Sequence, residues 1–332
     1  MRVVLSGCGS IGRRHAKNLM SLGNFDILAY DVSEERLDRI QSELPVKLTK
    51  DIVSALSTGI DALLVCSPTK YHVPQALEAV KRGIPTFIEK PLSDSLDRVD
   101  DLLLLADQKD VPILVGCNFR FDSGFTVIRE SLTCGLIGRP LAARAHFGQF
   151  LPNWRPDQDY RLSYSGKQSL GGGVILDQVH EIDYITCLLG QPDSVLCMAK
   201  RVSDLEIDTE DTAEILLWLN SGVLASIHVD CIRPVYDRSL EIVGTEGILQ
   251  WRFQDNFVQH FGSHSREWKI LSDSKKHDFN AMYVSEMHHF LEILARRETP
   301  LQDGRRGKEV LEIALAAKLS AELGRIVPLS AI

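Results

Sequence analysis

The hexapeptide Gly-Cys-Gly-Ser-Ile-Gly at residues 7–12 constrains the fold more strongly than any other feature of this 332-residue chain. It directly follows an apolar run at residues 3–6, which is typical of a β-strand, and it opens a helical pattern over residues 11–22. In such a unit the glycines allow a tight turn, a close backbone approach to a diphosphate and close helix packing. The helix start presents free N–H groups to the phosphates. We therefore predict a dinucleotide site that includes Gly7, Gly9, Ser10, Ile11 and Gly12.

A carboxylate at Asp31 indicates which dinucleotide would be bound. Asp31 follows the next β-rich run and lies 19 positions after Gly12, close to the spacing of about 20 that is typical of the acid binding the adenosine ribose. A carboxylate there accepts hydrogen bonds from the ribose hydroxyls and repels a 2′-phosphate. This favours NAD over NADP, although Arg13 and Arg14 could accommodate such a phosphate. The alternative is a glycine turn that serves only the chain geometry.

The order of predicted elements divides the chain into two parts. Residues 1–119 alternate apolar runs with helical patterns, which predicts a parallel sheet covered on both faces. Residues 120–332 contain longer strands joined by short glycine-containing turns, which predicts a large, mostly antiparallel open sheet. We predict an α/β protein with an N-terminal Rossmann domain and a C-terminal α/β domain for substrate binding and oligomerisation. The last helix, residues 306–323, is expected to pack back on the Rossmann domain.

The predicted strands of the second part carry apolar residues on both faces. Residues 223–231 alternate cleanly between apolar and polar, but in the preceding strand Leu216 and Trp218 share the face opposite Ile215 and Leu217. A sheet with two apolar faces needs cover on both. Helices would cover one face and a second subunit the other, so we expect a homodimer or homotetramer that associates through this sheet.

Composition excludes several classes of partner. The net charge of −8 disfavours a general nucleic-acid binder, and no apolar run reaches the roughly 18 residues that span a bilayer. The seven cysteines are scattered and form no CxxC pair, which disfavours a disulfide framework or a thiolate zinc site. We expect no nucleic-acid or membrane partner, no metal, reduced thiols and a cytoplasmic location.

The sequence Glu89-Lys90-Pro91 follows a short apolar run at residues 86–88. In an open α/β sheet, ligands bind beyond the carboxyl ends of the strands, so this turn would lie beside the bound nicotinamide. Lys90 could then hold a substrate hydroxyl or stabilise the charge of a developing alkoxide. The alternative is a surface lysine that precedes a turn proline.

Taken with further landmarks, these motifs resemble the Gfo/Idh/MocA family of glucose–fructose oxidoreductases, inositol dehydrogenases and related enzymes. The resemblance covers nearly the whole chain, because the landmarks occur in the family's order. They are the glycine turn, Cys66-Ser67-Pro68-Thr69-Lys70-Tyr71-His72, Glu89-Lys90-Pro91, Asn118-Phe119-Arg120-Phe121, Gly171-Gly172-Gly173, His180 with Asp183, Gly244-Thr245-Glu246-Gly247 and Ser320-Ala321.

The resemblance implies hydride transfer between NAD(P) and a carbon of a sugar, cyclitol or sugar derivative. It implies that Lys90 and His180 act at the reacting hydroxyl and that Pro91 follows a cis peptide bond. It also extends the expected cofactor site to Cys66, Ser67, Pro68, His72, Glu89 and Lys90.

His180 suits a general base, because its imidazole titrates near neutral pH. Asp183 would lie on the same helix face and orient the ring, and Asp177 could reach the same region. Many family members place an aspartate four residues before the histidine, whereas Asp177 precedes it by three. Asp177 could instead be the N-cap of the helix. A buried structural His180, or a metal bound by Asp177, His180 and Glu181, are the remaining alternatives.

Residues 151–170 form a polar, turn-rich segment that could hold the substrate. Its aromatic rings suit a sugar, and its cations suit a carboxylate or phosphate, which suggests a sugar carrying an anionic group, such as a nucleotide-activated sugar or a sugar acid. The alternative is an exposed connecting loop. The expected substrate residues are Asn118, Arg120, Trp154, Arg155, Tyr160, Arg161 and His180, with Tyr164 and Lys167 close by.

Three functions fit these patterns. The first is a sugar or cyclitol dehydrogenase. The second is an epimerase, lyase or glycosidase that recycles NAD internally on the same scaffold. The third is a non-catalytic NAD-binding sensor, which the combination of Lys90 and His180 disfavours because a sensor needs no acid–base pair. The sequence does not separate the first two.

Overall fold

The computed structural model describes residues 1–57, 59–156, 158–273 and 278–332. Packing groups the chain into two units, Met1–Asn118 with Asn280–Leu311, and Phe119–Phe279 with Glu312–Ile332. The domain boundary expected between residues 119 and 120 is close to the first of these divisions. The segment Asn280–Leu311, however, joins the first unit, and the division of the chain into domains at residue 119 stays a prediction.

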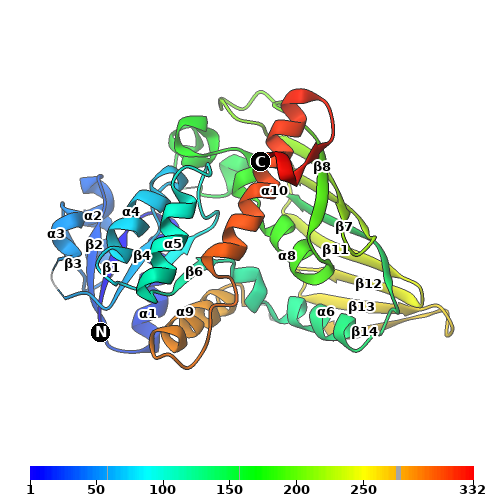
Figure 1. Ribbon diagram of the computed structural model, residues 1–332, viewed down its shortest axis with the longest axis horizontal. Coiled ribbons are helices and arrows are strands. Elements are labelled where there is room, and N and C mark those ends of the chain that lie inside the picture. The colour runs from blue at the N-terminus through cyan, green and yellow to red at the C-terminus, as the bar shows by residue number, and fades with distance from the viewer. Residues whose placement is uncertain (58, 157, 274–277) are drawn as a thin grey trace. The chain divides into compact units, whose positions relative to one another are not determined.

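The first unit contains a six-stranded parallel sheet (Figure 1). Its strand order is β3-β2-β1-β4-β5-β6, which is the doubly wound order of a Rossmann domain. The strands are short and almost entirely buried, as unalternating apolar runs predict. Their bounds are β1 Arg2–Ser6, β2 Asp26–Tyr30, β3 Lys47–Thr49, β4 Ala62–Val65, β5 Thr86–Glu89 and β6 Ile113–Gly116.

Helices cover both faces of this sheet. On one face a buried cluster joins Leu5 of β1 to Leu19, Leu37 and Phe290, which come from three different helices. Residues of opposite orientation such as Val4 are equally buried, so the other face is also covered. The helices of this unit are α1 Ser10–Leu22, α2 Glu34–Glu43, α3 Ile52–Ala55, α4 His72–Val80, α5 Val99–Lys109 and α9 Ala281–Leu294.

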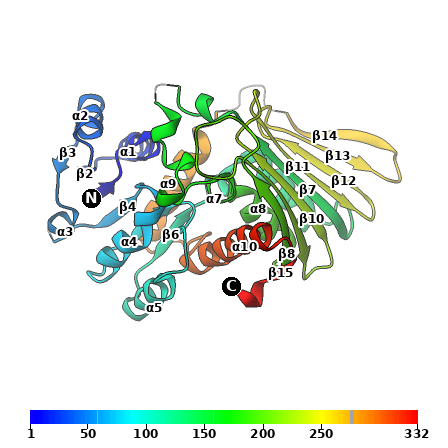
Figure 2. The same cartoon turned by 90° about the horizontal axis from the view of Figure 1, so that it is seen from above.

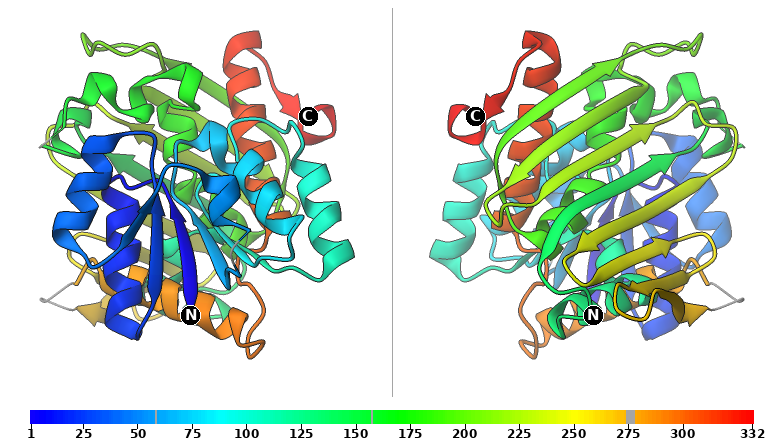
Figure 3. Two further views of the ribbon diagram at one scale, coloured as in Figure 1. Left: turned by 90° about the vertical axis from the view of Figure 1, so that its left-hand side faces the viewer. Right: turned by 90° about the vertical axis from the view of Figure 1, so that its right-hand side faces the viewer.

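The second unit is built on a nine-stranded sheet, shown face-on in Figure 3 (right). Only β7 and β10 pair in parallel, and all other neighbours are antiparallel. The spatial order is β14-β13-β12-β11-β7-β10-β9-β8-β15. The bounds are β7 Pro140–Gly148, β8 Pro192–Lys200, β9 Thr212–Leu219, β10 Leu224–Asp230, β11 Asp237–Gly244, β12 Gly247–Arg252, β13 Phe257–Gly262, β14 Glu267–Asp273 and β15 Val327–Pro328.

One face of this sheet packs on helices of the same unit. Alternate residues of β9, such as Ile215 and Leu217, are fully buried, and helix α8 contacts β7 and β10 on that face (Figure 2). The opposite face carries no helix of the described residues (Figure 3, right), and Leu216 and Trp218 on it are 40% and 56% exposed. The remaining helices are α6 Ser123–Thr133, α7 Val174–Asp177, α8 His180–Leu189 and α10 Gly304–Leu323, of which α10 continues from the first unit into the second.

Short 3-10 helices occupy the connections. Four of them, η3 to η6, lie in the segment that the sequence marks as the substrate loop. The bounds are η1 Thr69–Tyr71, η2 Asn118–Phe121, η3 Leu151–Asn153, η4 Tyr160–Leu162, η5 Tyr164–Gly166, η6 Gln168–Leu170 and η7 Leu329–Ala331. Among the helices of the described residues, none combines the length and the apolar character needed to cross a membrane.

Candidate active site

The glycine turn has the geometry that a dinucleotide site requires. Gly7 has φ +98°, and a Cβ there would lie 2.4 Å from the Cys66 backbone. A Cβ on Gly12 would lie 1.9 Å from the Gly7 carbonyl oxygen, so only glycine allows α1 to approach β1 this closely. No atom lies within 4 Å of the corresponding position on Gly9. No side chain caps the start of α1, which leaves N–H groups of its first turn available to an anion.

Asp31 is held beside this turn. Its Oδ2 accepts a hydrogen bond of 2.8 Å from the Cys8 amide and its Oδ1 one of 2.9 Å from the Ser33 amide. The side chain is 4% exposed, with the Arg36 guanidinium 3.8 Å away. Each carboxylate oxygen has a further lone pair, so the geometry is compatible with the predicted contact to a ribose.

The two arginines that could have accommodated a 2′-phosphate both contact other residues. Arg13 forms an ion pair of 3.4 Å with Glu43 and donates a hydrogen bond to the Cys8 carbonyl oxygen. The Arg14 guanidinium lies 4.5 Å from the centre of the Tyr283 ring, a cation–π contact.

His72 joins the two turns that follow β4 and β5. Its Nε2 lies 2.9 Å from the Ser67 carbonyl oxygen and its Nδ1 lies 2.8 Å from the Pro91 carbonyl oxygen. The ring is buried, and burial lowers the pKa of the imidazole. Both ring nitrogens face backbone carbonyls, so His72 supports the two turns. The cofactor contact expected of His72 stays a prediction. Nearby, the Ser67 hydroxyl donates to Gln75.

The thiols of the turns are uncharged. Burial raises the pKa of Cys8 to about 12 and the pKa of Cys66 well above its ordinary value. The seven cysteines all lie in the described residues and form no disulfide. Cys66 and Pro68 lie in the loop that follows β4, as expected from the sequence. Their contact with the cofactor stays a prediction.

Lys90 follows β5 directly, and the Lys90–Pro91 peptide is cis, which confirms the geometry that the family resemblance implies. Glu89 points inward: its Oε1 lies 2.6 Å from His15 Nε2, and its Oε2 accepts a hydrogen bond of 3.1 Å from the Lys90 amide. Glu89 therefore fixes the backbone at Lys90. The direct cofactor contact expected of Glu89 stays a prediction.

Asn118 ends the first unit and is 3% exposed. Its Nδ2 donates to the Met282 sulfur at 3.1 Å. A substrate role for Asn118 stays a prediction.

In the second unit, His180 is the first residue of α8 and is 6% exposed. Its ring packs edge-on against Phe119, with 4.8 Å between the ring centres. The N-cap of α8 is Val179, so the N-cap role considered for Asp177 is wrong. Asp177 instead ends α7, and its Oδ1 accepts a hydrogen bond of 2.7 Å from the Tyr164 hydroxyl.

A buried ion pair engages two residues expected at the substrate. Arg120 Nη2 donates to Asp183 Oδ1 at 2.7 Å and Arg120 Nε donates to Asp183 Oδ2 at 2.9 Å. The side chains are 7% and 2% exposed. Asp183 thus neutralises the charge of Arg120 within the fold. The expected role of Asp183 in orienting His180 and the expected substrate contact of Arg120 stay predictions.

Glu181 belongs to a second buried network that the sequence did not indicate. Its Oε1 lies 2.8 Å from Arg238 Nε, and the Arg238 guanidinium also donates to Gln178 and stacks 4.0 Å from the centre of the Phe119 ring. Among the described residues, Asp177, His180 and Glu181 do not form a group whose ligand atoms lie close enough together to hold a metal. Within the described ranges, the single group of His, Cys, Asp or Glu side chains close enough to hold a metal is His15, Glu89 and Glu286.

The aromatic residues of the expected substrate loop contact the backbone around them. Trp154 Nε1 donates to the Gln149 carbonyl oxygen at 2.8 Å, and the Tyr160 hydroxyl accepts from the Glu206 amide at 3.3 Å. Their ring faces stay candidates for a sugar contact.

The arginines of this loop also have partners in the second unit. Arg155 donates to Ser163 and lies 5.6 Å above the Tyr164 ring. Arg161 pairs with Asp159 and Glu206 at 2.8 and 3.0 Å. Two carboxylates therefore neutralise Arg161, which weakens the expectation of an anionic substrate.

Comparison with known proteins decides the family. The family model described as "Oxidoreductase family, NAD-binding Rossmann fold" matches residues 1–117, and the model of the Gfo/Idh/MocA C-terminal domain matches residues 125–250. The chain belongs to the Gfo/Idh/MocA family. It is an NAD-binding oxidoreductase with a Rossmann domain, which confirms the resemblance drawn from the motifs.

Several relatives match along their whole length. Myo-inositol 2-dehydrogenase of Thermotoga maritima is 31% identical, over 99% of this chain and 98% of the relative. The NAD(+)-dependent scyllo-inositol 2-dehydrogenase of Bacillus subtilis is 26% identical, over 99% and 96%. A crystal structure of a probable dehydrogenase from Thermotoga maritima has a TM-score of 0.82 and 29% identity, with all of both chains covered. Levoglucosan dehydrogenase in complex with NADH, at 18% identity and a TM-score of 0.89 over 99% of each chain, shows the same fold.

Proposed function

We propose that this oxidoreductase is an NAD-dependent dehydrogenase of an inositol or a closely related neutral sugar. The observation that carries the proposal is the 31% identity to a myo-inositol 2-dehydrogenase over 99% of the chain. The retention of Lys90 and His180 at the positions that the family motifs mark supports it. A polyol also suits a chain in which two arginines of the expected site, Arg120 and Arg161, are neutralised by carboxylates.

The proposed reaction divides between two side chains of this protein. NAD, once bound, would supply the acceptor for the hydride of the hydroxyl-bearing carbon. His180 takes the proton of the same hydroxyl, because a neutral imidazole is a suitable base near pH 7. The Lys90 ammonium stabilises the negative charge that develops on the oxygen. In the reverse direction His180 returns the proton.

The aspartates proposed as catalytic act indirectly in this scheme. Asp183 holds Arg120 and thereby the start of the second unit next to α8. Asp177 holds the Tyr164 hydroxyl and thereby the loop that precedes the glycine run. We propose that both orient surrounding segments, and that the proton transfer belongs to His180.

The preference for NAD rests on Asp31. Its carboxylate is buried beside the glycine turn, and its charge would repel a 2′-phosphate at that place. The engagement of Arg13 by Glu43 and of Arg14 by Tyr283 supports the same choice.

The uncovered sheet face supports association of this chain with itself. Strand register places Trp218, Leu224, Ala142, Val243 and Ile248 in one apolar row across five strands. The next row, which contains Leu216, Ser226, Arg144, Glu241 and Gln250, is mostly polar. A row of apolar residues beside a row of hydrogen-bonding groups is suited to an interface between copies, so we propose a homodimer or homotetramer through this face.

The test of the proposed activity is a substrate screen with the purified full chain. Myo-inositol, scyllo-inositol, glucose, a sugar acid and a nucleotide-activated sugar are each incubated with NAD⁺ or NADP⁺, and NAD(P)H is followed by absorbance. We expect NADH with an inositol or a neutral sugar and little with NADP⁺. Turnover of a substrate without net NADH would favour an epimerase, lyase or glycosidase that recycles its cofactor. Cofactor binding without turnover of any polyol would favour a sensor.

A further inference from the structure

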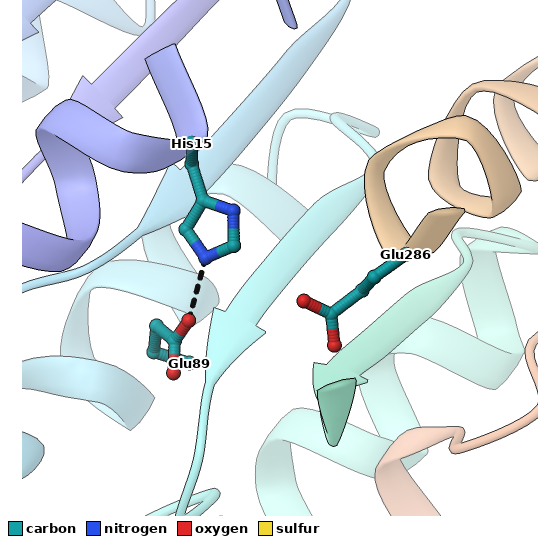
Figure 4. Close-up of side chains that lie close together, drawn as sticks. All are labelled: His15, Glu89 and Glu286. Carbon is teal, nitrogen blue, oxygen red and sulfur yellow. Dashed lines mark hydrogen bonds and ion pairs between the residues drawn. The ribbon is translucent and has the colours of Figure 1, made fainter. Parts of the chain in front are cut away.

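Three ionisable side chains from three different elements meet inside the first unit (Figure 4). His15 comes from α1, Glu89 from the end of β5 and Glu286 from α9. His15 and Glu286 are fully buried, and Glu89 is 7% exposed. One nitrogen or oxygen of each lies within 4.8 Å of the other two. Burying ionisable side chains costs free energy unless they are paired or uncharged. A buried cluster of three such side chains therefore needs a physical explanation.

Glu89 connects this cluster to Lys90. One carboxylate oxygen contacts His15 Nε2 at 2.6 Å and the other accepts from the Lys90 amide at 3.1 Å. The contact with His15 thus fixes the rotation of the carboxylate, and the rotation of the carboxylate decides whether it reaches Lys90. Charge-assisted hydrogen bonds of this kind are among the stronger ones in proteins.

His15 is itself held in place by aromatic rings. It packs edge-on against Phe87, with 4.9 Å between ring centres, and against Tyr283 at 6.0 Å. Phe87 lies on β5, two residues before Glu89. A ring that is confined on its sides directs Nε2 in one direction only, which makes His15 a rigid support for the carboxylate.

Glu286 closes the cluster from α9. Figure 4 shows its carboxyl group directed toward the His15–Glu89 pair, and neither of its oxygens has a hydrogen-bond partner among the described residues. Burial, together with the nearby charge of Glu89, raises its pKa well above the ordinary value for a glutamate. An uncharged carboxyl group fits this place, because it covers Glu89 without repelling it.

A divalent cation would be a different explanation of the same three residues. His15 Nε2 and Glu89 Oε1 are 2.6 Å apart, whereas two ligands of a tetrahedral zinc at about 2.0–2.1 Å lie roughly 3.3 Å apart. The observed separation is that of a hydrogen bond. The geometry therefore favours a shared proton between His15 Nε2 and Glu89 Oε1. Binding of a metal ion is tested in the third experiment below.

We propose that His15 and Glu286 are positioning residues that orient Lys90 through the carboxylate of Glu89. The proposal rests on the proposed function for its effect on catalysis, since Lys90 is there the group that stabilises the alkoxide. Its structural part, that His15 protects the Lys90 amide, is independent of any substrate.

The first experiment measures hydrogen exchange of the Lys90 amide in the full chain labelled with ¹⁵N-lysine. His15→Phe keeps an aromatic ring among Phe87 and Tyr283 but removes the ring nitrogens. His15→Gln places a side-chain N–H near the position of Nε2. We expect exchange at Lys90 to rise at least tenfold in His15→Phe and to stay within about threefold of the wild-type value in His15→Gln. Unchanged exchange in His15→Phe would overturn the proposal whatever the substrate screen shows. Should His15→Phe not fold, His15→Asn, whose amide is too short to reach Glu89, replaces it with the same expectations.

The second experiment compares kinetics and cofactor affinity. His15→Phe should lower kcat at least tenfold while the Kd for NADH changes less than twofold, and His15→Gln should recover most of the lost kcat. Equal losses in both variants would contradict a role through the hydrogen bond. Lys90→Met serves as the reference: full turnover of Lys90→Met would refute the proposed function of Lys90, while leaving the exchange result for His15 intact.

The third experiment separates the uncharged carboxyl from a metal ligand. Glu286→Gln keeps the shape and neutrality of the protonated side chain, so Lys90 exchange and kcat should stay within about threefold of wild type. Glu286→Lys introduces a charge beside the pair and should disturb both. One bound metal ion per chain that is lost in Glu286→Gln, as measured by elemental analysis, would overturn the proposal.

Discussion

The Arg120 guanidinium donates to both oxygens of the Asp183 carboxylate, at 2.7 and 2.9 Å, in the interior of the second unit. The two residues are 63 positions apart in the chain. One precedes α6 and the other lies in the first turn of α8, so the ion pair holds two segments together next to the proposed base His180. Its removal allows the contribution of this support to be measured.

Asp183→Ala should destabilise the protein by about 3–5 kcal/mol, because it leaves a buried guanidinium without its carboxylate. The melting temperature and the urea midpoint measure the loss. Glu206→Ala removes a carboxylate from the exposed arginine Arg161 and is the matched control, for which we expect no measurable change in melting temperature. The double variant Arg120→Met with Asp183→Leu removes both charges. If it is no more stable than Asp183→Ala, the unpaired guanidinium is not the cause of the stability loss in Asp183→Ala.

His180→Ala should lower kcat by about 10²–10⁴, since it removes the proposed proton acceptor. The Kd for NADH should change less than twofold, because the glycine turn and Asp31 lie in the other unit. Stopped-flow kinetics of NADH formation and fluorescence titration supply the two values. Tyr184→Phe removes a hydroxyl from the same helix and is the control. A His180→Ala enzyme that retains wild-type turnover would exclude His180 as the base.

Replacement of Asp31 should change the choice of cofactor. Asp31→Ser removes the carboxylate that would repel a 2′-phosphate, so we expect kcat/KM for NAD⁺ to fall about tenfold and kcat/KM for NADP⁺ to rise. Asp31→Asn also removes the charge, but its single amide oxygen can accept from only one of the Cys8 and Ser33 amides, whereas the carboxylate accepts from both. If the ratio of the two cofactors is unchanged in both variants, Asp31 does not select between them.

Stability should depend on pH through Glu286. Its folded-state pKa is raised by burial first and by the charge of Glu89 second. A group with a raised folded pKa contributes stability that is present below its unfolded pKa, about 4.3, and that is lost as the pH rises toward the folded value. Glu286→Gln cannot ionise, so between pH 5 and 8 its urea midpoint should fall less with pH than that of wild type. Parallel curves for the two proteins would show that Glu286 is ionised in the fold. Glu292→Gln, whose pKa an arginine lowers, is the matched control on the same helix.

The outer face of the nine-stranded sheet should control association. Trp218→Lys places a charge in the apolar row, and light scattering coupled to size exclusion should show a smaller assembly than wild type. Leu104→Lys is the control, because Leu104 is 59% exposed on α5, close to the 56% of Trp218. A wild-type assembly in Trp218→Lys would assign the interface to another surface.

The sequence allowed those features to be predicted whose cause is local. The glycine turn, the position of Asp31 beside it and the apolar parallel strands all follow from residues within about 30 positions of one another. The same holds for the two faces of β9, since alternation in a strand is a property of neighbouring residues. Strands β13 and β14 show little alternation of buried and exposed residues, and Ile270 on β14 is 60% exposed, so this edge of the sheet carries a weaker strand pattern than β9.

Partner choice among charged residues could not be predicted in this way. Asp183 was expected to orient His180, three positions away, and the sequence did not indicate its pair with Arg120, 63 positions away. Glu181 was considered as a metal ligand, but the distant Arg238 of β11 neutralises it. In both cases the sequence shows which charged side chain is present. The packing of helices and sheet determines which oppositely charged side chain lies next to it. His15 lies three positions after Gly12, close to the glycine motif. Its contact with Glu89 was not predicted.

The histidine that spans two turns also limits how this protein can be re-engineered. Because the His72 ring contacts the carbonyl oxygens of both Ser67 and Pro91, the loop after β4 and the loop carrying Lys90 form one structural unit. A loop transplanted from a relative to alter cofactor or substrate choice would have to arrive together with its neighbour. Exchange of the loop after β4 alone would remove the support that His72 gives to both loops. Lys90 would then change position although its own loop had not been exchanged.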